Sequence, residues 1–225
     1  MKLSRGWLAT IIIVAVILID QFVKIWVKTS FYYGEELVIT DWFRLYFIEN
    51  NGMAFGFEFG SKLILTWFRI IAVGLFIYYI VRIHCRTDIP RGFLVCISLI
   101  TAGAAGNVID CIFYGLIFDA PAFPHTATLF PPDGGYGTIF NGRVVDMLYF
   151  PLVEWNWPEW MPWVGGNHFV FFQPIFNIAD AALSVGVIVL IFFYSRHLSG
   201  NALKISNDGG SNDELKVEQN NDSNV

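Results

Sequence analysis

The hydrophobic positions of the chain form four long runs, separated by stretches rich in polar and turn-forming residues. A helix needs about 20 predominantly apolar residues to cross the hydrocarbon core of a bilayer. The runs reach this length and predict helices over about residues 7–27, 63–83, 92–114 and 175–194. The pattern therefore predicts an all-α membrane protein with four transmembrane helices.

The first run has the basic start of a secretory signal peptide, with Lys2 and Arg5 ahead of it. It is longer than the apolar part of such a peptide, Asp20 interrupts it, and no small-x-small cleavage site follows. We therefore interpret it as an uncleaved first helix.

The segments outside the helices predict a small sheet and a long outer loop. Residues 37–40 and 43–48 are rich in aromatic and β-branched types, which favour strands, so a small extracytoplasmic β-sheet is expected. The outer loop, 115–174, has four tryptophans between Trp155 and Trp163. Tryptophan favours the membrane–water interface. Two roles are open for this segment: a lid over a pocket, or an anchor for the loop.

Basic residues at the ends of the runs predict the orientation of the chain. Most fall on one side of the membrane: Lys2, Arg5, Arg82, Arg86, Arg91, Arg196 and Lys204. The positive-inside rule then places both termini in the cytoplasm. Residues 1–198 are expected to form the membrane domain, and the polar residues 199–225 a disordered cytoplasmic tail.

Composition excludes several classes of protein. Hydrophobic residues make up 55% of the chain and charged residues 15%, against about a quarter charged in a soluble domain. The mean hydropathy is +0.54. The net charge of −5 arises mainly in 208–225, and the nearly neutral remainder argues against a nucleic-acid partner. The four histidines and three cysteines show no ligand spacing, so neither a metal nor a cofactor is predicted.

Polar side chains interrupt the predicted helices near their outer ends. Three pairs stand at helical spacing: Asp20 with Lys24, Asn107 with Asp110, and Asn177 with Asp180. A charged residue at the centre of a membrane helix costs about 2.5–3.5 kcal/mol on insertion scales, so it needs a partner or a function. Buried hydrogen bonds that merely hold the helices together are the simpler interpretation. Because all three pairs fall at one depth, we expect a shared polar pocket.

Aspartates that share such a pocket suit acid–base chemistry. Two neighbouring carboxylates do not ionise together cheaply, so one keeps a proton while the other acts as a base. Such a pair can activate water for attack on a peptide carbonyl and then protonate the leaving amine. The alternatives are a small ion- or proton-coupled transporter and a non-enzymatic membrane scaffold. The large outer loops and the lack of an inverted repeat in the sequence argue against a transporter.

Five sequence blocks resemble those of the lipoprotein signal peptidases, the signal peptidase II family. They follow the family's order: Asp20-Gln21 with Lys24, 50–56 (NNGMAFG), 106–110 (GNVID), 142–146 (GRVVD) and 176–180 (FNIAD). The resemblance implies four transmembrane helices, an extracytoplasmic β-cradle and an aspartyl protease of the bacterial inner membrane. Such an enzyme removes signal peptides from prolipoproteins, near the outer face, by cleaving before the diacylglyceryl-modified cysteine. Its partners are the prolipoprotein and membrane lipid, and it uses no metal.

The resemblance also assigns roles to residues. The family's catalytic pair falls on Asp146 and Asp180, whereas spacing alone leaves Asp110 as an equal candidate. Supporting or substrate-binding positions fall on Asp20, Lys24, Asn50, Gly52, Asn107, Asp110, Arg143, Asn177 and Ala179.

The chain departs from the family pattern in two ways. The family usually has Arg after the aspartate of the GNxxD block, whereas this chain has Cys111; Arg143 is a candidate replacement. The intervals on either side of Asp146 are longer than in typical members and introduce Asp119 and Asp133 as rivals. We keep Asp146 because its neighbours are apolar, whereas both rivals stand among Pro and Gly.

Overall fold

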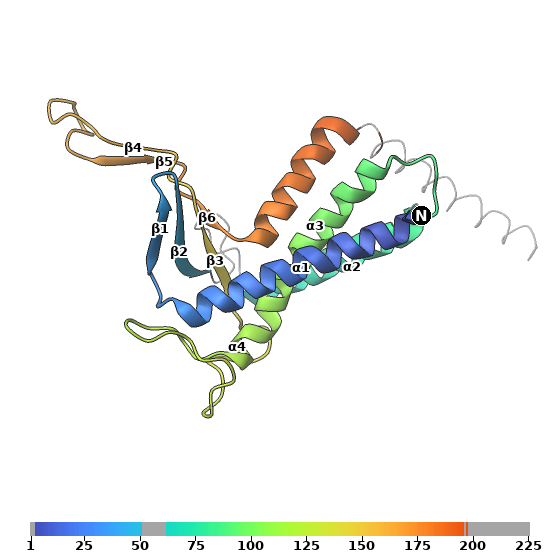
Figure 1. The fold of residues 1–225 in the computed structure, drawn as a ribbon, viewed down its shortest axis with the longest axis horizontal. Helices are drawn as coiled ribbons and strands as arrows, with labels where there is room; N and C mark the ends of the chain where they lie inside the picture. Colours follow the sequence, from blue (N-terminus) through green and yellow to red (C-terminus); the bar gives the residue numbers. More distant parts are fainter. Residues whose placement is uncertain (1–2, 51–61, 196, 198–225) are drawn as a thin grey trace, which may run out of the picture.

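The computed structural model describes residues 3–50, 62–195 and 197. Four helices in these ranges are long and apolar enough to cross a membrane. They are α1 (Arg5–Ser30), α2 (Lys62–Ile83), α3 (Arg91–Ile109) and the last helix (Ile178–Ser195), which is orange in Figure 1. The prediction of four transmembrane helices is therefore confirmed. The tail 199–225 lies outside the described residues.

Three helix ends near the sheet lie about three residues from their predicted positions, and the first of them is the end of α1, at Ser30 instead of about residue 27. The third helix continues beyond α3 as a π-helix, η1 (Asp110–Tyr114), and a short α4 (Gly115–Ile117). The last helix begins at Ile178 instead of about residue 175. Its predicted first turn forms strand β6 (Ile175–Phe176) instead, because these residues pair with a neighbouring strand.

A four-stranded antiparallel sheet lies at one end of the helices (Figure 1). β1 (Glu36–Thr40) and β2 (Phe43–Asn50) are the two strands predicted from the sequence, and they are confirmed. β3 (Val144–Tyr149) pairs with β2, and β6 pairs with β3, which gives the order β1-β2-β3-β6. The sheet thus joins residues from both sides of the long outer loop.

One face of this sheet packs against the end of the bundle. Leu45 and Phe47 of β2 and Val145 and Met147 of β3 are buried in one apolar cluster with Val27 of α1. Alternate residues of a strand point to opposite faces. The buried side chains therefore direct Asp146, between Val145 and Met147, to the other face of the sheet.

The tryptophan-rich segment lies in a hairpin that projects from the sheet, away from the helices (Figure 1). β4 (Val153–Asn156) pairs antiparallel with β5 (His168–Phe171). Near the hairpin tip, the exposed fractions of Trp160 and Trp163 are 78% and 101%. This position favours the anchoring role over the lid, because strand pairing holds the segment as a ribbon that leads away from the helix ends.

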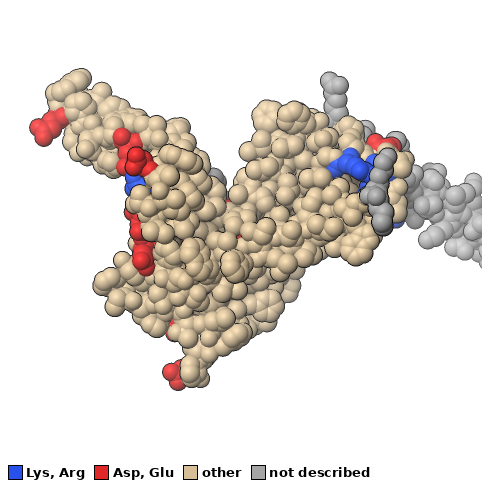
Figure 2. Space-filling view, in the orientation of Figure 1, with Lys and Arg blue, Asp and Glu red and all other residues tan. Residues whose placement is uncertain are grey.

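Charged side chains gather at the two ends of the molecule, and the helical shaft between them is almost uncharged on the face shown in Figure 2. On this face Lys and Arg lie mainly at the end that carries the N-terminus, beside some acidic atoms, whereas Asp and Glu lie mainly over the sheet, the hairpin and the lower loop, with some basic atoms among them. An apolar belt between two charged ends is the surface that a bilayer requires.

Candidate active site

The three polar pairs predicted from the sequence meet around Lys24 at the end of the bundle beside the sheet, which is called the outer end here to distinguish it from the inner end at the N-terminus. Lys24 Nζ lies 2.8 Å from Asp20 Oδ2 and 2.7 Å from Asp110 Oδ2. It also donates a hydrogen bond to Asn107 Oδ1 at 2.9 Å. An ammonium group has three protons, so each one has an acceptor. All four side chains are buried.

Asn107 extends this cluster from α3 to the last helix. Its Nδ2 donates to Asp180 Oδ1 at 2.7 Å. In the same first turn, the backbone N–H of Ala179 donates to Asp20 Oδ1 at 2.8 Å. The free N–H groups at a helix start attract carboxylates, so α1 contributes an anion that fixes the last helix in place.

A close helix contact supports these bonds. A Cβ atom added at Gly103 of α3 would lie 2.2 Å from the backbone oxygen of Ala179, and one at Gly106 would lie 2.9 Å from Asp20 Oδ2. Glycine allows membrane helices to approach this closely. Because positions 103 and 106 are both glycine, the two helices lie close enough for Asn107 to reach the first turn of the last helix.

Asn177 holds both aspartates of the candidate pair. It precedes the last helix, where its Oδ1 accepts from the Asp180 N–H at 2.9 Å and its own N–H donates to Asp180 Oδ2 at 3.4 Å. This reciprocal pair is a capping box, which satisfies two otherwise unpaired backbone donors. The Asn177 side-chain N–H donates to Asp146 Oδ1 at 2.7 Å. The FNIAD block therefore begins a helix and connects Asp180 to Asp146.

Asp146 lies on β3, opposite Ile48 of β2, and is 3% exposed. The pKa of Asp146 is raised to about 7, mainly by burial and also by the nearby Asp180 carboxylate, although hydrogen bonds from Asn177 and Asn50 and the charge of Lys24 act in the opposite direction. At neutral pH, this carboxyl group therefore carries a proton for a large part of the time.

Gln21 and Tyr114 also belong to the cluster, although the sequence assigned them no role. Gln21 Nε2 donates to Asp110 Oδ1 at 2.8 Å, and the Tyr114 hydroxyl donates to Gln21 Oε1 at 3.2 Å. Gln21 stands beside Asp20 in the first sequence block, which was a usable signal. The sequence contained no such signal for Tyr114, because this residue lies in the π-helix η1, which the sequence did not predict. Insertions of this kind are frequent at functional sites.

Comparison with known proteins identifies the family. Residues 12–196 match the family model described as Signal peptidase (SPase) II. The chain belongs to the signal peptidase II family. A lipoprotein signal peptidase of Porphyromonas gingivalis is 48% identical over 198 residues, covering 88% of this chain and 87% of that protein. One of Amoebophilus asiaticus is 39% identical over 181 residues, covering 78% and 72%.

A solved structure of a bacterial membrane enzyme has the same fold, with a TM-score of 0.54 at 24% identity, over 85% of this chain and 90% of that one. The predicted membership of signal peptidase II and the predicted fold class are confirmed. Family membership makes the chain a bacterial membrane protease. Nothing in these comparisons supports the transporter or the scaffold.

Arg143, the candidate replacement for the missing family arginine, pairs with a different carboxylate. Arg143 Nη1 bonds to Glu49 Oε2 at 3.0 Å, and Glu49 also pairs with Lys28. The cation beside Asp110 is Lys24. At Cys111 itself, Arg69 of α2 donates from Nη1 to Sγ at 3.5 Å.

The remaining candidates from the sequence lie outside the cluster around Lys24 or outside the described residues. Asp119 accepts from the Thr128 N–H at 2.6 Å within the outer loop, and Asp133 is exposed. Gly52 lies outside the described residues. Within the described ranges, no three His, Cys, Asp or Glu side chains form a group that could hold a metal ion.

Proposed function

We propose that this protein is an aspartic endopeptidase that removes signal peptides from diacylglyceryl-modified prolipoproteins by cleaving before the lipidated cysteine. The observation that supports this most directly is the double attachment of Asn177. One side chain bonds both to Asp146, on the sheet, and to Asp180, on the last helix. A buried carboxylate, Asp146, and a partly buried one, Asp180, that share one positioning residue suit the division of labour between acid and base.

In the proposed mechanism, Asp180 is the base and Asp146 the acid. Asp180 takes a proton from a water molecule as its oxygen attacks the scissile carbonyl carbon, and Asp146 gives its proton to the carbonyl oxygen. Asp146 then takes a proton back from the resulting diol, and Asp180 donates its proton to the leaving nitrogen as the C–N bond breaks. Both residues return to their starting states, without a covalent intermediate or a metal ion.

The buried cluster positions this pair. Lys24 donates a hydrogen bond to Asn107, which donates one to Asp180, so a positive charge lies near that carboxylate. On the other side, Asn50 of β2 forms a hydrogen bond to Asp146. We assign a supporting or substrate-binding role to Asp20, Lys24, Asn50, Asn107, Asp110, Arg143, Asn177 and Ala179. Gly52 keeps the substrate-binding role that the family resemblance implies.

The proposed setting is the inner membrane, with both termini in the cytoplasm and the site near the outer face. Basic residues at the N-terminal end and acidic residues over the sheet support this orientation (Figure 2). The two acyl chains of the substrate remain in the bilayer, so the site must be open to lipid from the side. Each buried CH₂ contributes about 0.8 kcal/mol to membrane partitioning, so non-lipidated precursor should be cleaved poorly.

The test is incubation of the purified protein with lipidated and non-lipidated precursor, with cleavage read by gel shift. Asp146→Asn and Asp180→Asn should each lower turnover by roughly 10²–10⁴-fold, while Asp133→Asn, an exposed aspartate in the outer loop, should leave it unchanged. Near-normal cleavage by Asp146→Asn would disprove the assignment of the pair. Equal rates on both precursors would contradict the lipid-dependent site.

A further inference from the structure

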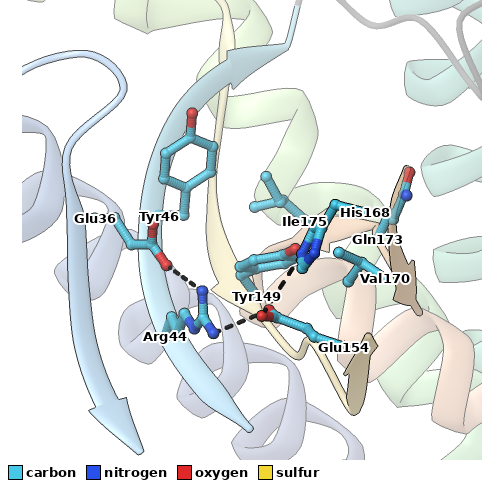
Figure 3. Close-up of a pocket in the computed structure, with 9 residues that line it drawn as sticks. All are labelled: Glu36, Arg44, Tyr46, Tyr149, Glu154, His168, Val170, Gln173 and Ile175. Atoms are coloured by element: carbon cyan, nitrogen blue, oxygen red, sulfur yellow. Dashed lines mark hydrogen bonds and ion pairs between the residues drawn. The ribbon is translucent and has the colours of Figure 1, made fainter. Parts of the chain in front are cut away.

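A polar pocket of about 400 Å³ lies between the four-stranded sheet and the projecting hairpin (Figure 3). Its floor crosses all four strands, with Glu36 on β1, Arg44 and Tyr46 on β2, Tyr149 on β3 and Ile175 on β6. Glu36 is paired with Tyr46, Arg44 with Tyr149, and Tyr149 with Ile175. Directly paired residues lie on the same face of a sheet, so these side chains form one continuous row.

Residues of the hairpin cover this row. Glu154 of β4 and His168 of β5 point toward Arg44 and Tyr149 (Figure 3). Arg44 joins the two parts, because it bonds to Glu36 at 3.0 Å and to Glu154 at 2.9 Å. The pocket therefore exists only because the hairpin is held over the sheet.

The pocket lies on the same face of the sheet as Asp146. Asp146 is opposite Ile48, which is in phase along β2 with Tyr46 and Arg44. A register shift between Leu45 and Ile48 returns Tyr149, the third residue after Asp146, to that face. A strand advances about 3.3 Å per residue, so the pocket begins roughly 10 Å from Asp146. It extends from there to the hairpin, whose residues Glu154, His168 and Val170 also line it.

The chemistry of the pocket favours a ligand that donates hydrogen bonds or carries positive charge. Two carboxylates, Glu36 and Glu154, outnumber the one guanidinium group, Arg44, and His168 Nε2 lies 3.8 Å from Glu154 Oε2. The side chains of Glu36 and Glu154 are 35% and 28% exposed, so both remain accessible.

We propose that this pocket binds the part of the substrate that follows the scissile bond and that it prefers a basic side chain there. The inference rests on the proposed function. A membrane-embedded signal peptide lies along the helices, so the chain beyond the cut leaves across the outer sheet. An extended chain spans the distance from Asp146 in about three residues. The side chain two to four positions after the lipidated cysteine therefore reaches Glu36 and Glu154.

The experiment uses two lipidated precursors that differ only at the third and fourth residues after the lipidated cysteine, which are Lys in one and Glu in the other. The ratio of kcat/KM for the Lys form to that for the Glu form should exceed one. Glu154→Gln and Glu36→Gln should each lower this ratio by roughly twofold to fivefold, as expected for partly exposed charge pairs. Glu159→Gln, an exposed carboxylate beyond the pocket in the same hairpin, is the matched control and should leave the ratio unchanged.

The ratio is measured within one preparation, so partial unfolding of a variant cancels. A ratio of one in the wild type would overturn the inference, as would a ratio that neither glutamate variant changes while both precursors are cleaved. No cleavage of either precursor by the wild type would overturn the proposed function, and the inference with it.

Discussion

The two ends of the helical bundle are held together by different physics. At the inner end, residues such as Phe93, Ile97 and Leu190 form a buried cluster that is almost entirely apolar. At the outer end, the same helices bury Asp20, Lys24, Asn107 and Asp110 in one hydrogen-bonded cluster. Both ends are closely packed, so packing alone does not call for the charges.

This difference shows where function constrains the fold. Burying an ion pair is often no more stabilising than apolar residues of the same volume, because desolvation opposes the attraction. The inner end demonstrates that this bundle can be held by apolar contacts. We infer that the outer charges are retained because they position Asp180 and, through Asn177, Asp146.

The largest effect should follow from removing the central cation. Lys24→Met would leave the carboxylates of Asp20 and Asp110 buried near each other without a counter-ion. Breaking a buried pair in this way costs about 3–5 kcal/mol, so the free energy of unfolding in micelles should fall by that amount and turnover should be lost.

The matched control is at the inner end, where Ile97→Val should lower the free energy of unfolding by only about 0.5–1.5 kcal/mol and leave turnover intact. If Lys24→Met unfolded no more easily than Ile97→Val, the contrast between the two ends would be wrong.

The next effect concerns the helix contact that supports the cluster. Gly103→Ala would place a Cβ atom 2.2 Å from the backbone oxygen of Ala179, so the last helix would have to move. Overpacking of this kind costs about 1–3 kcal/mol, and it should also lower kcat by displacing Asp180.

Gly74→Ala on α2 is the control for that substitution. A Cβ atom there meets nothing within 4 Å, so the higher helix propensity of alanine should stabilise the protein by up to about 1 kcal/mol. Equal effects of the two substitutions on the thermal unfolding midpoint would contradict the close contact at Gly103.

The protonation of Asp146 predicts a pH dependence with a definite sign. Since its pKa is raised to about 7 from an ordinary 3.8, the folded protein binds this proton more tightly than the unfolded chain. The stability contribution of the proton is complete below about pH 4 and is lost as pH rises to about 7. Turnover should decline on the alkaline side, by about tenfold per unit above pH 7, because the acid loses its proton.

Parallel unfolding and activity profiles between pH 4 and pH 9 check this prediction. Asp146→Asn removes the titrating group, so its free energy of unfolding should change less between pH 4 and pH 7 than that of the wild type. An activity profile that stays flat up to pH 9 would exclude Asp146 as the acid.

Much of this arrangement was predictable from the sequence, and the failures have physical causes. Hydrophobic run length predicted the helices, and the i,i+3 and i,i+4 spacing predicted which polar residues share one helix face, because both patterns are local. The order of the sheet was not predictable, since β3 and β6 are joined to β2 only by long-range pairing. For the same reason, Asp146 was selected by family resemblance and not by spacing.

The partner of Arg143 was not predictable for a related reason. Arg143 was one candidate for the cation beside Asp110, whereas the structure pairs it with the buried carboxylate of Glu49. Lys24 is the cation beside Asp110. Which cation serves which anion is a property of the folded structure, because it depends on burial and on pairing between distant segments.

The smallest expected effect concerns the tip of the hairpin, which tests the lid against the anchor. Trp160 and Trp163 are largely exposed and lie on a ribbon that leads away from the helices (Figure 1). Replacing both with Ser leaves the strand pairs of β4 and β5 and the bond between Arg44 and Glu154 intact. We expect turnover of the lipidated precursor to change by less than about twofold, because neither indole ring contacts the cluster around Asp146. Indole rings favour the headgroup region, so the double variant should instead show weaker quenching of its remaining tryptophans by headgroup-level probes in vesicles. A tenfold loss of kcat in a correctly inserted Trp160→Ser, Trp163→Ser variant would contradict the anchoring role and support the lid instead.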